Sequence, residues 1–146
     1  NNFGINHSSG FEAQYNAIKF TIAGVGFFIT ALSLIVGGIG IMNIMFVSVK
    51  ERTREIGIRK ALGATPFNIM VQFLTESIII CLMGGVLAIG ISFIISDIIN
   101  QFFPSSMPIN LALLSIFISV LIGVISGFIP SSRASKLDPI EALRYE

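Results

Sequence analysis

The sequence has little charge, one histidine, one cysteine and no tryptophan. Only 12% of its 146 residues are charged, about half the roughly 25% of a soluble domain. With His7 as the single histidine, the chain does not supply a histidine-based metal site or a Ser-His-Asp triad. Nine basic and eight acidic residues nearly cancel, and nothing in them indicates nucleic-acid binding. We expect no catalytic, metal or cofactor site in this chain, and Cys81 is expected to be a small packing residue.

The sequence contains three long uncharged segments. No charge occurs between Lys19 and Lys50, between Glu76 and Asp97, or between Asp97 and Arg133. Each segment matches or exceeds the roughly 20 residues that a membrane-spanning helix needs. The sequence therefore predicts an all-α integral membrane protein with three transmembrane helices, at 20–49, 66–97 and 111–130.

The distribution of basic residues predicts the orientation in the membrane. The segments 50–65 and 131–146 carry eight of the nine Lys and Arg residues, and three spans place both segments on one side. By the positive-inside rule that side is cytoplasmic. The N-terminus is then outside, with 1–19 as an extracytoplasmic stalk, 98–110 as an extracytoplasmic loop, 50–65 as a cytoplasmic coupling loop and 131–146 as a cytoplasmic tail.

Cap and stop signals divide the segment 50–65. Thr65 and Pro66 are suited to the N-cap and first position of the second span. Gly57 disfavours a continuous helix, and Gly63 is a plausible C-terminal stop. These signals predict a short helix over 58–62. The front half of the segment could continue the first helix, with Glu55 and Arg59 paired at a spacing of four residues.

This short helix has an apolar face. Ile58, Ala61 and Leu62 share one side, and Arg59 and Lys60 lie off it. Such a helix, held between two spans, can dock into a soluble protein and pass movement to both spans. A solvated basic loop that only fixes topology is the alternative.

The tail contains a helix-start signal. Asp138 and Pro139 suit the N-cap and first helical position, and Glu141 follows at the third. These signals predict a short helix, with Arg144 beyond it, that can lie against anionic lipid as an interfacial helix.

Small residues recur every four positions in the last two spans. Such stripes let helix backbones approach closely in lipid, so these spans are expected to pack on each other or on a second copy of the chain. The positions singled out are Gly84, Ala88 and Ser92 in the second span and Ser119, Gly123 and Gly127 in the third.

The blocks GGIGIMNIMFVSVK, ERTREIGIRKALGAT and SSRASKLDPIEALRYE resemble the C-terminal transmembrane part of MacB-type ABC transporter permeases, within the FtsX-like permease family. The resemblance implies a dimeric permease in the cell (cytoplasmic or inner) membrane. It also implies a cytoplasmic ABC ATPase, separate or fused, that holds ATP and Mg, and an extracytoplasmic adaptor protein. The permease would transmit ATPase movement across the membrane to drive efflux or extraction. The coupling helix carries over to Ile58, Arg59, Lys60, Ala61 and Leu62, and a second ATPase contact to Asp138, Glu141 and Arg144.

The sequence departs from this family pattern in having three spans, where members have four and a large extracytoplasmic domain. We therefore expect a fragment or one part of a split permease. An alternative is an FtsX-like signalling or scaffold subunit that regulates an extracellular cell-wall hydrolase. An independent channel is disfavoured, because the spans offer no polar pore lining beyond Ser and Thr.

Overall fold

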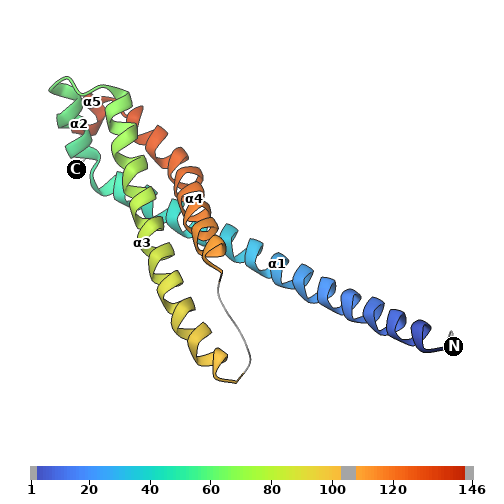
Figure 1. The fold of residues 1–146 in the computed structure, drawn as a ribbon. Helices are drawn as coiled ribbons and strands as arrows, with labels where there is room; N and C mark the ends of the chain where they lie inside the picture. The colour runs from blue at the N-terminus through green and yellow to red at the C-terminus, as the bar shows by residue number, and fades with distance from the viewer. Residues whose placement is uncertain (1–2, 103–107, 144–146) are drawn as a thin grey trace. The chain divides into compact units, whose positions relative to one another are not determined.

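A computed structural model describes the backbone of residues 3–102 and 108–143 and the side chains of 11–102 and 108–142. The described residues form five helices, namely α1 (Phe3–Glu51), α2 (Thr53–Ala61), α3 (Pro66–Asn100), α4 (Ile109–Ser135) and α5 (Pro139–Leu143) (Figure 1). Three helical segments are long and apolar enough to cross a membrane: Phe11–Glu51, Pro66–Asn100 and Ile109–Ser135. The prediction of an all-helical chain with three candidate spans is confirmed.

The chain divides into two units, Asn1–Gly37 and Gly38–Glu146. The first unit is the N-terminal part of α1, which is helical from Phe3 onward. The segment assigned to a stalk is thus the beginning of the same helix as the first span. Phe11, Tyr15 and Ile18 are all more than half exposed along it.

Local signals predict the first residues of α3 and α5 correctly. The Thr65 hydroxyl accepts a hydrogen bond from the Asn68 N–H at 3.3 Å, and Pro66 is the first residue of α3. Asp138 Oδ1 accepts from the Ile140 N–H at 2.8 Å, next to Pro139 at the start of α5. These two predicted caps are confirmed.

The helix between the first two spans is longer than predicted. α2 begins at Thr53 and passes through Gly57, so the expected interruption there is wrong. Gly57 is buried beside Ile56, and burial on a packed face offsets the weak helix preference of glycine. The break lies instead at Arg52, with φ −100° and ψ 12°. Gly63 has φ +98°, a conformation that glycine adopts readily, and it ends this segment as predicted.

α4 also continues further than expected. The helix passes through Pro130, which is buried, and ends at Ser135. Membrane helices tolerate an internal proline where neighbouring helices and hydroxyl side chains surround the interrupted backbone. Ser126 and Ser131, on either side of Pro130, are buried too.

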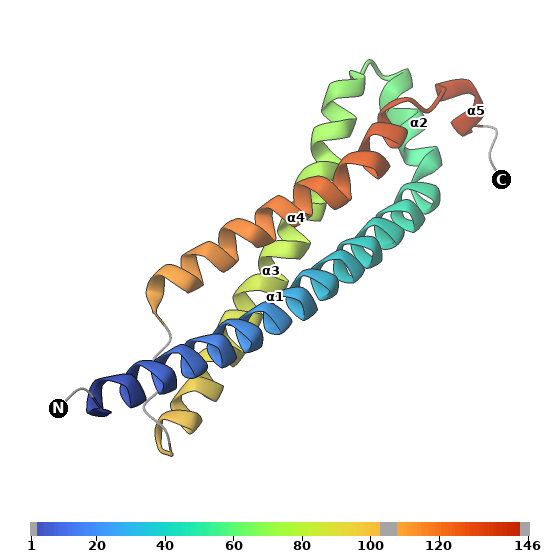
Figure 2. The same cartoon turned by 90° about the vertical axis from the view of Figure 1, so that its right-hand side faces the viewer.

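α3 and α4 contact each other in the second unit (Figures 1 and 2), and small residues form the contact. The Ser77 hydroxyl lies within hydrogen-bonding distance of two carbonyl oxygens, that of Leu74 at 2.7 Å and that of Gly123 across the interface at 2.9 Å. A β-carbon at position 123 would lie 2.9 Å from the Cα of Ile78, and one at position 127 would lie 2.6 Å from the Cβ of Ser77. Only glycine permits this approach.

The structure places the six predicted packing residues in two groups. Gly123 and Gly127 lie against Ser77, and Ser119 lies against Gly85. By contrast Gly84, Ala88 and Ser92 are exposed in this chain, and a β-carbon at position 84 would meet nothing within 4 Å. α3 therefore uses the face that carries Ser77, Cys81 and Gly85 to contact α4, and contact of the other stripe with a second copy stays a prediction.

Candidate functional site

The ends of the three candidate spans meet around α2. A hydrophobic core joins residues from four helices there: Met45, Val49, Ile56, Ile69, Phe73 and Ala134, with Ile41, Ala64 and Leu137 packed against it. The contributions come from α1, α2, α3 and α4. Because buried side chains are close-packed and resist compression, α2 cannot shift without displacing the ends of the spans.

The two sides of α2 differ sharply in exposure. Ile56, at 2% exposed, faces the core. On the opposite side Ile58 is 44% exposed and Leu62, just after the helix, is 84% exposed. We call Ile58 and Leu62 the outer apolar face, and Ala61 near them is exposed as well. Apolar side chains that are exposed together in a charged segment outside the apolar spans form a surface on which another protein can dock.

The two basic residues of the predicted coupling helix have partners inside the chain. Arg59 donates to the carboxylate of Glu55 and to the side-chain oxygen of Gln72 on α3. The pairing of Glu55 with Arg59 is confirmed. The Lys60 ammonium donates to the carbonyl oxygen of Leu137 at 2.7 Å, in the link between α4 and α5. Arg59 and Lys60 thus fix α2 in place, a use that the sequence did not indicate.

The tail helix packs beside α2 (Figure 2). Ala142 of α5 is 2% exposed, whereas Ile140 is 77% exposed. Asp138 caps α5, and the Glu141 side chain is exposed. Arg144, the third residue predicted for a second contact, lies outside the described residues.

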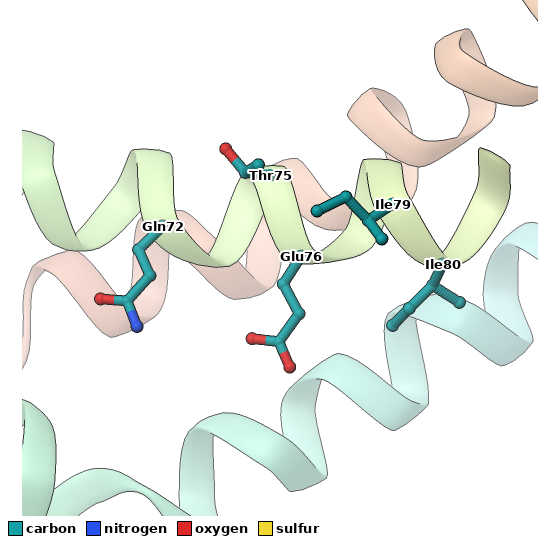
Figure 3. A pocket seen from close by; sticks show the side chains of 5 residues that line it. All are labelled: Gln72, Thr75, Glu76, Ile79 and Ile80. Carbon is teal, nitrogen blue, oxygen red and sulfur yellow. The ribbon is translucent and has the colours of Figure 1, made fainter. Parts of the chain in front are cut away.

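A shallow hollow lies along α3 (Figure 3). Arg52, at the break between these helices, pairs with Glu76 at an N–O distance of 3.3 Å. Glu76 and Gln72 point to the same side of α3 in Figure 3. The hollow is lined by Gln72, Thr75, Glu76, Ile79 and Ile80. The ion pair thus connects the α1–α2 junction to α3 more than two helical turns beyond its first residue.

Reversing one charge of this pair tests the connection. The Arg52 and Glu76 side chains are 46% and 31% exposed, so the pair is expected to contribute no more than about 1 kcal/mol. Glu76→Lys should lower the thermal midpoint of the purified protein, and adding Arg52→Glu should restore most of the loss. If the double variant loses as much stability as the two single variants together, the two residues do not interact.

Comparison with known proteins identifies the family. The family described as FtsX-like permease C-terminal matches residues 27–139. The chain belongs to the FtsX-like permease family. The match includes the whole of α2, α3 and α4 and hence the core around α2.

The relatives that the chain matches are named as ABC transporter permeases. The chain is 52% identical over 135 residues to the uncharacterized ABC transporter permease YknZ of Bacillus subtilis, covering 91% of this chain and 33% of the relative. It is 46% identical over 119 residues to the macrolide export ATP-binding/permease protein MacB of Psychrobacter cryohalolentis, covering 79% and 18%. Identity to MacB of Neisseria gonorrhoeae is 41% over 135 residues, covering 90% and 20%. The chain therefore spans a third or less of the length of these relatives.

The family and the three apolar helices together define the class of protein. This FtsX-like permease domain is a multi-pass protein of the cell membrane (cytoplasmic or inner), of the kind found in ABC transporters. The predicted resemblance to MacB-type permeases is confirmed.

Proposed function

We propose that this FtsX-like permease domain transmits movement of a cytoplasmic ABC ATPase to the opposite side of the membrane, with α2 as its coupling helix. In this arrangement α2 and α5 lie in the cytoplasm and the N-terminus lies outside. The charge distribution supports this orientation, since 50–65 and 131–146 hold eight of the nine basic residues.

One observation carries the proposal. α2 presents an uncovered apolar face, Ile58 and Leu62, while its other face is part of a core shared with all three candidate spans. A partner that holds the outer face and moves it therefore moves the ends of three helices together. The ion pair of Arg52 with Glu76 and the Arg59 contact with Gln72 extend this connection along α3.

The relatives' names support the class of partner. MacB is named an ATP-binding/permease protein, with both activities in one polypeptide, and YknZ is named a permease. We propose that ATP and Mg bind to an ATPase of this type, that a second permease copy completes the transporter, and that an extracytoplasmic adaptor takes part in efflux or extraction. The names of the relatives do not favour the alternative of a cell-wall hydrolase regulator.

In-cell photo-crosslinking from position 62 tests the proposal. A photoreactive residue in place of Leu62, which is 84% exposed, should capture an ATPase. Mass spectrometry should identify the captured protein by peptides that include a phosphate-binding loop. The same residue at position 56, which is 2% exposed, should capture this chain alone. Capture of only lipid or unrelated proteins from position 62 would make the segment a topological anchor and refute the coupling role.

A further inference from the structure

A cation lies against an aromatic ring where α1 and α4 meet. The guanidinium carbon of Arg133 lies 5.1 Å from the centre of the Phe46 ring. This attraction to the ring uses none of the N–H donors along the edge of the guanidinium in a hydrogen bond, so that edge is available. That edge suits the bidentate binding of a phosphate group.

A second cation occupies the same end of α1. Lys50 follows Phe46 by four residues, which places it on the same side of the helix one turn further on. Lys50 ends the uncharged run of the first span, and Arg133 is the first charge after Asp97. Both cations therefore mark the boundary where an apolar span leaves the hydrocarbon, the depth at which lipid phosphates lie.

Neither of these two cations forms an ion pair among the residues that the structure describes. The ion pairs there join Arg52 to Glu76 and Arg59 to Glu55. Glu51 follows Lys50 in sequence, but successive side chains on a helix are turned by about 100° from each other. Lys50 and Arg133 thus present positive charge that these carboxylates do not neutralise.

An apolar surface adjoins the pair on the membrane side. Ile129 and Ile125, one and two turns before Arg133 on the same side of α4, are 49% and 60% exposed. α1 and α4 come close near there, since a β-carbon at Gly38 would lie 3.7 Å from the Ile122 side chain and 2.9 Å from the Ser126 hydroxyl oxygen. A molecule bound here would have its anionic group at the cations and an apolar tail along α4.

We propose that Arg133 and Lys50, with Phe46 fixing the guanidinium, bind the phosphate of an anionic phospholipid. A lipid fits better than free phosphate because the cations lie directly beside exposed apolar surface at the end of a span. The proposal does not depend on an ATPase contact at α2.

The association of labelled lipids with the full-length protein tests this site. The measurement is the protein's preference for spin-labelled phosphatidylglycerol over spin-labelled phosphatidylcholine in phosphatidylcholine nanodiscs. Each basic residue near an anionic lipid strengthens its association with the protein about fivefold. The ratio of phosphatidylglycerol to phosphatidylcholine association should therefore be about 25-fold lower in the double variant Lys50→Gln, Arg133→Gln. Phe46→Leu should weaken it less, because the guanidinium then loses its support but keeps its charge.

Lys136→Gln is the matched control, because it removes one charge from the same end of α4. It should leave most of the preference, with helix content unchanged in every variant. A preference retained in the double variant, or lost equally in the Lys136 variant, would overturn the site in favour of a diffuse surface charge. Displacement of the lipid by inorganic phosphate at equal concentration would overturn the choice of lipid over free anion.

Discussion

Replacing Leu62 by aspartate is expected to abolish stimulation of the partner ATPase while the permease still inserts into the membrane. Leu62 is 84% exposed and lies outside the core around α2, so the substitution leaves the fold intact. In a docked complex the new carboxylate would be buried without a partner, at a cost of several kcal/mol. The contact should weaken by about 100-fold or more.

The measurement is ATPase activity of the reconstituted complex with and without the permease. Leu62→Met keeps an apolar side chain of similar volume and should retain coupling. An aspartate variant that stimulates the ATPase as well as the unsubstituted protein would remove the outer apolar face from the coupling contact. Loss of membrane insertion in that variant would instead show that Leu62 is part of the folded core.

Replacing Gly127 by valine should separate α3 from α4. The new β-carbon would lie 2.6 Å from the Cβ of Ser77, closer than non-bonded carbons approach. Overpacking of this kind costs about 1–3 kcal/mol, and separation would also break the Ser77 contact with the Gly123 carbonyl. We expect a loss of about 3 kcal/mol, measured as a lower thermal midpoint of the purified protein.

Gly84→Val provides the matched control for this substitution. A β-carbon there meets nothing within 4 Å, so this variant should keep the stability of the isolated chain. Adding Ser77→Gly to Gly127→Ala should recover part of the stability that Gly127→Ala alone loses, because it removes the atoms that clash. If Gly127→Val is as stable as the unsubstituted protein, the α3–α4 contact is misassigned.

Local chemistry explains what the sequence could predict. Uncharged runs identify three spans, because a charge within hydrocarbon is costly wherever the rest of the chain lies. Thr65 and Asp138 identify helix starts, since a side-chain oxygen there bonds to a backbone N–H only two or three residues away. Gly63 ends a helix through its own backbone conformation. None of these signals depends on tertiary contacts.

The sequence did not predict the features that depend on contacts with a neighbouring helix. Gly57 is acceptable within α2 because its side of the helix is buried, which a local pattern does not reveal. The repeat at Gly84 and the face at Ser77 and Gly85 are both rich in small residues, and only the position of α4 distinguishes them. The sequence predicts Lys60 as a solvated charge, because the Leu137 carbonyl that accepts its hydrogen bond lies far away in the chain.

The bond between Lys60 and the Leu137 carbonyl has a consequence for biosynthesis. The two residues are 77 positions apart in the chain, and translation at about 5–20 residues per second separates their synthesis by roughly 4 to 15 s. During that interval α2 has been made, but the link between α4 and α5 that holds it does not yet exist. The last of the contacts that hold α2 therefore forms only after the last span has been synthesised, and a partner that needs all of these contacts in place meets them only on chains that contain all three spans.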